Sequence, residues 1–169
     1  MVQCHTIDIE STPAHLKRPM QLVHGTAVRL GQAGVLLRGP SGSGKSDLAL
    51  RLIEAGASLV ADDQVALALD GAEIWLSAPP AIAGMIEARG VGILRLPRVP
   101  RAVLRLVCDL VPREQVERLP ERGDCTLLGV TVPRLALCAF DAATPTKLRF
   151  ALRAVTGETI AAEPLSVQP

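Results

Sequence analysis

The stretch "LLRGPSGSGKSDLALRLIEAGASLVADDQVAL", Leu36–Leu67, determines the fold expected for this chain. Within it, Gly39–Ser46 fits the pattern G-x-x-x-x-G-K-[ST], which predicts a phosphate-binding loop between a strand and a helix. The preceding "VLLRG" is typical of a short buried strand, and apolar residues recur at helical spacing from Lys45 until Gly56. The following "SLVAD" is nearly all apolar, as in a strand covered on both faces. The stretch therefore predicts an α/β fold with a strand–loop–helix nucleus.

Length and composition favour one globular domain. The chain has 169 residues, of which 49% are hydrophobic and 21% are charged, and its net charge is +1. This balance shows no excess of basic residues of the kind that binds nucleic acid or an anionic membrane surface. Because no run reaches about 18 apolar residues and no signal peptide is recognisable, we expect a cytoplasmic protein with no membrane contact. The four cysteines show no metal-binding spacing and are expected to be free thiols.

The remaining chain predicts further strands and one more helix. "QLVHGTAVRL" alternates like a strand interrupted at His24-Gly25, and "VALALDGAEIWLSAP" is expected to be a hairpin turning at Asp70-Gly71. "AVLRLVCDLV" alternates as well, and "TLLGVTVPRLALCAF" suggests two short strands separated by Pro133. "TPTKLRFALRAVTGE" predicts a final helix. We expect an N-terminal arm over residues 1–19, a catalytic domain over 20–160 and a C-terminal tail over 161–169.

The glycine-rich loop has a defined chemistry. Glycines allow the backbone to curl with its N–H groups pointing inward, and these groups cradle a polyphosphate together with the helix N-terminus. The lysine would reach the terminal phosphates, and the serine hydroxyl after it would coordinate Mg²⁺. The residues expected to bind the nucleotide are Gly39, Pro40, Ser41, Gly42, Ser43, Gly44, Lys45 and Ser46.

Two adjacent aspartates, Asp62 and Asp63, follow the next strand, 17 and 18 residues after Lys45. Ligands in open α/β sheets bind beyond the carboxyl ends of the strands, so the pair faces the phosphates if its strand lies beside the loop's strand. A pair of carboxylates allows one to lie near a metal and the other to accept a proton from an attacking hydroxyl. The alternative is a solvated turn, "DDQ", after a strand.

Three other positions leave their roles open on sequence grounds alone. Glu87 and Arg89 form a charged pair in an otherwise apolar stretch, which suits either a surface turn or a site. His24 lies beside a glycine, where a histidine is most often a turn residue. Trp75 is expected to pack in the core.

Four motifs in order give the chain a family resemblance. "HG", "GPSGSGKS", "LVADD" and "IEARGVGIL" together resemble the catalytic, C-terminal domain of HPr kinase/phosphorylase. The resemblance runs from about Leu22 to Leu96. It continues more weakly through "VERL" (Val116–Leu119) and "LGVTVPRLAL" (Leu128–Leu137). Four motifs in the right order are far more specific than the glycine-rich loop alone.

The resemblance implies a fold and an activity. The family has a P-loop kinase domain of the HPr kinase and phosphoenolpyruvate carboxykinase type, with a mixed sheet, and it phosphorylates a serine of HPr, a small carrier of the bacterial phosphotransferase system. ATP and Mg²⁺ are implied, with Ser46 and Glu87 as Mg²⁺ contacts. One of Asp62 and Asp63 would accept the serine proton. The motifs leave the choice open; we favour Asp63, with Asp62 organising metal or water.

Two further residues are carried over from the resemblance. His24 would support or orient groups close to the phosphates. Arg118, in "ERL", matches an arginine that the family uses at its active site, although this alignment is looser.

The chain also departs from the family pattern. We expect a short form without the N-terminal regulatory domain. The segment Cys138–Lys147 lacks the arginines of the loop associated with removing phosphate from HPr, and it carries Asp141 instead, so phosphorylase activity is expected to be weak or absent. The family forms hexamers, which makes a homo-oligomer an open expectation for a shortened relative. Two other functions stay open: a nucleotide-binding regulatory module, and a small-molecule kinase on the same fold.

Overall fold

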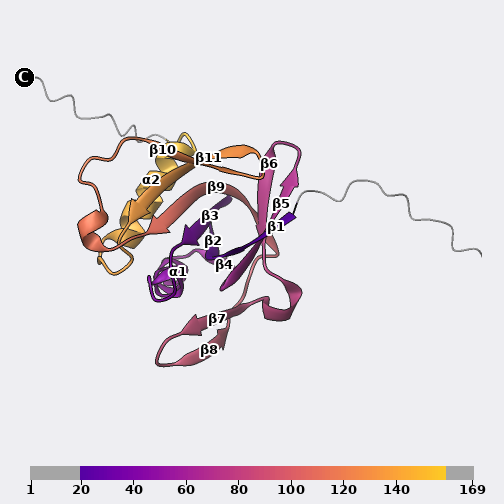
Figure 1. Cartoon of the computed structure of the whole chain (residues 1–169). Helices are drawn as coiled ribbons and strands as arrows, with labels where there is room; N and C mark the ends of the chain where they lie inside the picture. Colours follow the sequence, from indigo (N-terminus) through magenta and orange to yellow (C-terminus); the bar gives the residue numbers. More distant parts are fainter. Residues whose placement is uncertain (1–19, 159–169) are drawn as a thin grey trace, which may run out of the picture.

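The computed structural model describes residues 20–158, so the expected arm and tail, residues 1–19 and 161–169, lie outside the described residues. The described part is a mixed α/β fold with a curled nine-stranded sheet, two α-helices and a separate two-stranded hairpin (Figure 1). Both helices lie on one side of the sheet, and the hairpin projects from the end at which α1 lies.

The expected nucleus is present. Strand β3 (Ala33–Arg38) leads into the glycine-rich loop, helix α1 (Lys45–Glu54) follows, and β4 (Ser58–Ala61) comes next. The helix ends where the sequence predicts, because Gly56 has a left-handed backbone (φ +95°) and its N–H bonds to the carbonyl of Ile53 at 2.9 Å.

The order of strands places β2 (Thr26–Leu30) between β3 and β4, and it is antiparallel to both. The condition stated for the aspartates, that their strand lies directly beside the loop's strand, is therefore not met. Because β3 and β4 both run opposite to β2, they still run in the same direction, and their carboxyl ends reach the same edge of the sheet. The two acidic residues after β4 are thus delivered to the glycine-rich loop across one intervening strand.

The other elements complete the sheet around a long central strand. Their order across the sheet is β1-β5-β6-β9-β3-β2-β4, and β11 pairs with the last part of β9 beyond the β6 contact. The break at Gly25 and the hairpin at Gly71 are found as predicted. The elements not yet given are β1 (Met20–His24), β5 (Gln64–Asp70), β6 (Glu73–Ser77), β7 (Met85–Ala88), β8 (Gly92–Arg95), β9 (Arg101–Leu110), β10 (Gly123–Leu127), β11 (Val130–Leu137), α2 (Thr144–Val155) and the short 3₁₀ helices Pro80–Ile82 and Arg113–Gln115.

Pro133 does not separate two strands, contrary to the sequence expectation. It lies inside β11, and the turn comes earlier, at Leu128 and Gly129, which both have positive φ. Pairing of β11 with β9 begins only at Arg134, so at Pro133 the strand has β10 as its one neighbour. A proline fits such a position because its missing N–H can face the open side.

Two apolar clusters lie on the two faces of the sheet. One lies under both helices and includes Val35, Leu37, Leu48 and Leu148. The other lies on the opposite face, inside the curl of the sheet, and includes Leu36. Alternation along β3 therefore supplies side chains to both clusters. Among residues 20–158, no helix is long and apolar enough to cross a membrane.

Candidate active site

The loop Gly39–Ser46, called the glycine loop below, has a backbone that requires its glycines. Gly42 and Gly44 have φ of +82° and +89°, a region that residues with a Cβ rarely adopt. At Gly44 there is also no room, since an added Cβ would lie 2.7 Å from the Cβ of Ala139. The loop is thus closely packed against the segment that follows β11, and it opens on its other side.

Lys45 lies at the first turn of α1 with its ammonium folded over the loop. Its Nζ donates to the carbonyl oxygens of Gly39 at 2.8 Å and Pro40 at 2.9 Å. Burial lowers the pKa of Lys45, although the nearby charges of Asp62 and Asp63 act in the opposite direction. A cation held at the mouth of the loop in this way is suited to a phosphate that can replace the two carbonyl contacts.

Asp62 is buried and accepts three hydrogen bonds. Its Oδ1 accepts from the hydroxyls of Thr26 at 2.6 Å and Ser46 at 2.8 Å, and its Oδ2 accepts from the backbone N–H of Glu87 at 3.0 Å. This carboxylate therefore joins three parts of the chain: β2, the end of the glycine loop and β7. Since Ser46 and Asp62 are in contact, they can share one metal ion between them.

Asp63 has a different environment from its neighbour. Its side chain is 69% exposed, and its Oδ1 lies 3.5 Å from Nδ1 of His24. Its backbone is left-handed (φ +66°), and its carbonyl accepts from the N–H of Gly25 at 3.1 Å. With this backbone conformation, the side chain of Asp62 points into the protein and that of Asp63 points toward solvent.

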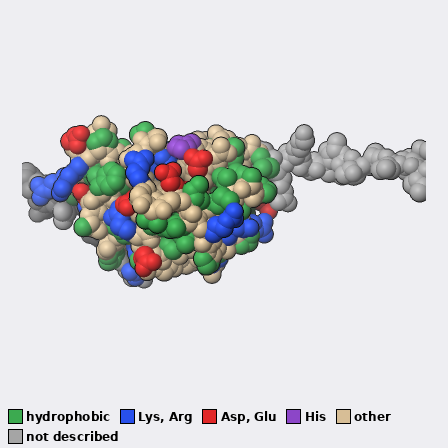
Figure 2. Space-filling view, turned by 90° about the horizontal axis from the view of Figure 1, so that it is seen from below, with side chains coloured by type: hydrophobic (Ala, Val, Ile, Leu, Met, Phe, Trp, Pro, Cys, Tyr) green, Lys and Arg blue, Asp and Glu red, His purple; other side chains and the backbone are tan. Residues whose placement is uncertain are grey.

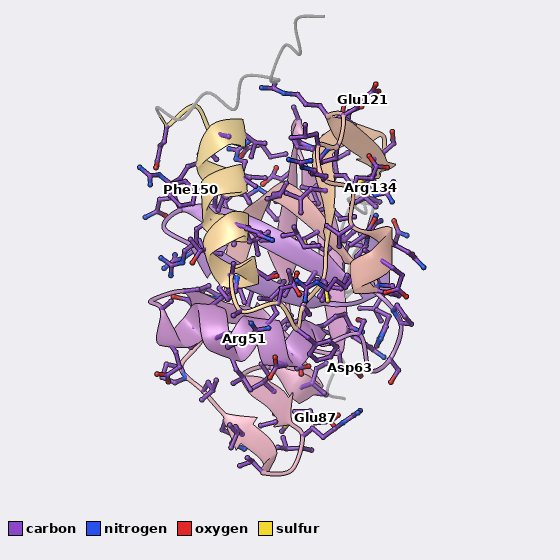
Figure 3. All side chains as sticks on the ribbon, turned by 90° about the vertical axis from the view of Figure 1, so that its left-hand side faces the viewer. Arg51, Asp63, Glu87, Glu121, Arg134 and Phe150 are labelled. Carbon is purple, nitrogen blue, oxygen red and sulfur yellow. The ribbon has the colours of Figure 1, made fainter. Side chains whose placement is uncertain are left out.

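The hairpin formed by β7 and β8 is the other wall of the site. Glu87 and Arg89 are both exposed, and Glu87 is attached to Asp62 through its backbone N–H. Figure 3 shows Asp63 and Glu87 on the same side of the molecule, at the end where the hairpin lies. The charged pair in "IEARGVGIL" therefore belongs to the site rather than to a remote surface turn.

These parts enclose a cleft of about 720 Å³. It is lined by most of the glycine loop, both aspartates, His24, the hairpin and Phe140. Seen from the hairpin end, acidic side chains and a histidine gather close together on this face (Figure 2). The volume lies within the range of small-molecule sites, and it is ample for a nucleotide.

The residues present fit a nucleotide with Mg²⁺. Within residues 20–158, no group of three or more His, Cys, Asp or Glu could hold a metal by itself. Mg²⁺ does not need one, because it usually takes one or two carboxylates and completes its shell with phosphate oxygens and water. In the glycine loop, Ser46 lines the cleft and its hydroxyl contacts the carboxylate of Asp62, so these two oxygen donors can reach a metal ion bound beside the phosphates.

The structure brings together nearly all of the residues singled out from the sequence. Arg118 is the exception, because it is exposed and does not line the cleft. Two residues were missed. For Thr26 the sequence held one signal, namely a hydroxyl at a core-facing position of an apolar strand. For Phe140 it held none, because the position of this ring at the cleft mouth depends on packing against Gly44.

Comparisons with known proteins show which family the chain is similar to. The family model of the HPr Serine kinase C-terminal domain matches residues 17–143. HPr kinase/phosphorylase of Limosilactobacillus reuteri is 35% identical over 131 residues, covering 70% of this chain and 41% of that protein. The Geobacillus thermodenitrificans protein of the same name is 36% identical over 131 residues, covering 70% and 42%. The chain thus spans about two fifths of the length of these relatives.

A solved structure shares the fold. The Hpr(Ser) kinase/phosphatase from Coxiella burnetii superposes with a TM-score of 0.73 at 26% identity, covering 82% of this chain and 97% of that one. The family match extends over most of the chain, including the glycine loop, both aspartates and the hairpin. The chain is therefore a member of the HPr serine kinase C-terminal domain family.

Proposed function

We propose that this chain is an ATP-dependent protein kinase that phosphorylates a serine of an HPr-like phosphocarrier protein. Family membership supports a kinase-type enzyme. The observation that carries the proposal is the hydrogen bond between Ser46 and Asp62 at 2.8 Å, with Asp63 exposed beside it. This arrangement offers a metal position and a proton acceptor at the mouth of one glycine loop.

The nucleotide would be held mainly by the glycine loop. Its backbone N–H groups and the N-terminus of α1 suit the β- and γ-phosphates of ATP. Lys45 would exchange its carbonyl contacts with Gly39 and Pro40 for phosphate oxygens, which neutralises charge as the γ-phosphoryl group is transferred.

Mg²⁺ would be held by Ser46 and Asp62, with Glu87 as a further contact. Bound there, the ion would supply charge neutralisation for the β- and γ-phosphate oxygens. Asp62 suits this role because three donors fix its orientation. The same contacts make it a poor proton acceptor, since Oδ1 already accepts two hydrogen bonds.

Asp63 is then the better candidate for the base. Its carboxylate is exposed at the cleft, where a protein substrate can reach it. In the proposed step the serine oxygen bonds to the γ-phosphorus, the bridging P–O bond to ADP breaks, and the serine proton passes to Asp63. His24, 3.5 Å from Asp63, would orient that carboxylate.

Removal of phosphate from the carrier is expected to be weak. The segment Cys138–Lys147 contains no arginine, and its Asp141 forms an ion pair with Arg113 at 3.6 Å. An incoming inorganic phosphate would therefore find little positive charge there. A role for Arg118 and assembly into a homo-oligomer also stay predictions.

The test is a transfer assay with γ-labelled ATP, Mg²⁺ and the HPr-like carrier of the same cell. Label should appear on the carrier and be absent from a carrier whose target serine is replaced by alanine. Nucleotide binding without transfer to any carrier would favour the regulatory module instead. Label on a small molecule from a cell extract would favour a small-molecule kinase.

A further inference from the structure

A second cleft, of about 710 Å³, lies away from the active site and shares no lining residue with it. It is formed by the turn between β2 and β3, by β6, by the start of β9 and by the last turns of α2. These elements lie at the end of the molecule opposite the β7–β8 hairpin (Figure 1). Strand β3 begins at this cleft and ends at the glycine loop, a span of roughly 17 Å.

The lining of this cleft is strongly basic, although the whole chain has a net charge of only +1. Five arginines line it against two glutamates, which leaves an excess of three positive charges. They come from separate elements, so the concentration of charge arises from the fold and is not visible as a run in the sequence. The arginines are Arg29, Arg101, Arg105, Arg149 and Arg153.

Only part of this charge is neutralised within residues 20–158. Arg105 pairs with Glu73 at 2.6 Å, and Arg153 pairs with Glu158 at 3.5 Å. The other three arginines form no ion pair with a described carboxylate. The guanidinium of one of them, Arg101, lies over the ring of Trp75 at 4.2 Å from its centroid.

Two of the three arginines without an ion pair also have a buried donor without an acceptor. The Nε atoms of Arg29 and Arg149 are buried and make no hydrogen bond, although Nη2 of Arg149 donates to the carbonyl of Ala55. Buried donors in native structures are nearly always satisfied, so each such atom calls for an acceptor. Because a guanidinium presents its donors as a fork, the acceptor that suits it best is a phosphate or carboxylate group.

We propose that this cleft binds a small organic polyanion carrying two or more phosphate or carboxylate groups. The volume of the cleft, about 710 Å³, lies within the range of small-molecule sites. Anionic groups would satisfy Arg29 and Arg149 and draw Arg101 toward the ligand. The half-buried ring of Trp75, expected in the core, instead forms one side of the cleft. The proposal uses no residue of the active site and does not depend on the kinase activity.

The chain contains its own reporter for this cleft. Trp75 is the single tryptophan and there is no tyrosine, so fluorescence excited at the indole band comes from this ring. Binding that moves the Arg101 guanidinium off the ring should change that emission. Tripolyphosphate serves as the phosphate probe and citrate as the carboxylate probe, both at constant ionic strength. The titrations are made in a Lys45→Ala variant, because this substitution should weaken binding of the same probes at the glycine loop.

We expect a saturable change in Trp75 emission with at least one probe. In Arg29→Gln/Arg149→Gln, the concentration for half-saturation should rise at least about tenfold, the scale of one or two lost charge-assisted hydrogen bonds. The matched control is Arg95→Gln, an exposed arginine of β8 outside the cleft, which should titrate like the parent. If the double variant fails to fold by circular dichroism, Arg101→Gln read by titration calorimetry replaces it.

Several results would overturn the proposal. One is a linear, non-saturable emission change with both probes, and another is equal binding by the double variant and the Arg95→Gln control. Tighter binding of a short DNA duplex than of either probe would also contradict it. If the proposal holds, the probe that binds more tightly shows whether the cleft prefers phosphate or carboxylate groups.

Discussion

The hydroxyl of Thr26 donates to the buried carboxylate of Asp62 at 2.6 Å, on the same oxygen that accepts from Ser46. A strand residue thereby fixes the orientation of a site residue. We expect Thr26→Val, which keeps the shape but removes the donor, to lower the free energy of unfolding by about 1.5–3 kcal/mol. The melting temperature should then fall by roughly 5 °C for a chain of this size. Thermal melts followed by circular dichroism would measure it.

Thr26→Ser is the matched control because it keeps the hydroxyl, and it should restore most of the stability. In the transfer assay, Thr26→Val should also raise the Mg²⁺ concentration for half-maximal activity, and Thr26→Ser should not. If the two variants behave alike in both measurements, the hydrogen bond does not position Asp62.

The two adjacent aspartates should respond differently to the same change. In Asp63→Asn we expect nucleotide affinity to stay within about twofold and transfer to fall by 10²–10⁴-fold, the usual worth of a general base. In Asp62→Asn, the Mg²⁺ dependence of nucleotide binding should weaken as well. Single-turnover transfer and calorimetric titration with Mg²⁺–ATP separate these effects. Equal loss of nucleotide binding in both variants would contradict the assignment.

Gly44 and Gly42 provide a matched pair for testing the loop. Both have left-handed backbones, but only at Gly44 would a Cβ collide, 2.7 Å from Ala139; at Gly42 nothing lies within 4 Å. Gly42→Ala should cost about 1 kcal/mol of stability from backbone strain alone. Gly44→Ala should cost clearly more and weaken nucleotide binding at least tenfold. Urea unfolding and nucleotide titration would show it, and the reverse order would be evidence against the loop packing described.

Asp109 connects stability to pH. Burial on its own raises the pKa of this carboxyl, but hydrogen bonds from Arg38, at 2.7 Å and 3.0 Å, and from Arg134 outweigh it. The pKa therefore lies below its ordinary value of 3.8. A carboxyl with a lowered pKa in the folded state contributes stability that is complete above pH 3.8. That contribution disappears as the pH falls through the folded-state pKa.

The stability difference between wild type and Asp109→Asn should accordingly be constant from about pH 5 to 8 and shrink below about pH 4. Urea unfolding over this range measures it. Glu121→Gln, an exposed carboxylate with no ion pair to a described residue, is the control and should show little difference at any pH. A difference for Asp109→Asn that grows on acidification would have the wrong sign for these ion pairs.

Cys108 should be inert while the protein is folded. Burial raises the pKa of this thiol to about 12, so almost no thiolate exists near neutral pH. Iodoacetamide at about pH 8 should leave the peptide containing Cys108 unmodified in native protein and modify it fully in urea. Peptide mapping by mass spectrometry reads both, and rapid native labelling would show that β9 is less tightly packed than described.

The strand–loop–helix nucleus was predictable because short-range signals determine it. Glycines at φ values closed to other residues, apolar spacing after Lys45 and the stop at Gly56 are all local features. The hairpin at Gly71 follows from the same kind of local turn chemistry. Most of the site residues were also found, since the motifs lie on segments that the fold brings to one edge of the sheet.

What could not be predicted depends on pairing between distant segments. No local signal places β2 between β3 and β4, so the sequence left open whether these two strands are direct neighbours. Pro133 was misread for the same reason, because its tolerance depends on where β9 begins to pair with β11. The arginine-lined cleft also combines elements that are far apart in sequence.

The β7–β8 hairpin forms a sheet of its own, and its ladder does not continue into the nine-stranded sheet. Its attachment includes Ile86, which is buried in the core, and the single N–H of Glu87 on Asp62. Its tip, around Gly90 and Val91, can therefore gain or lose residues without disturbing the sheet's hydrogen bonding. For the proposed kinase, lengthening or shortening that tip would change the surface offered to an acceptor while leaving the glycine loop and its contacts unchanged.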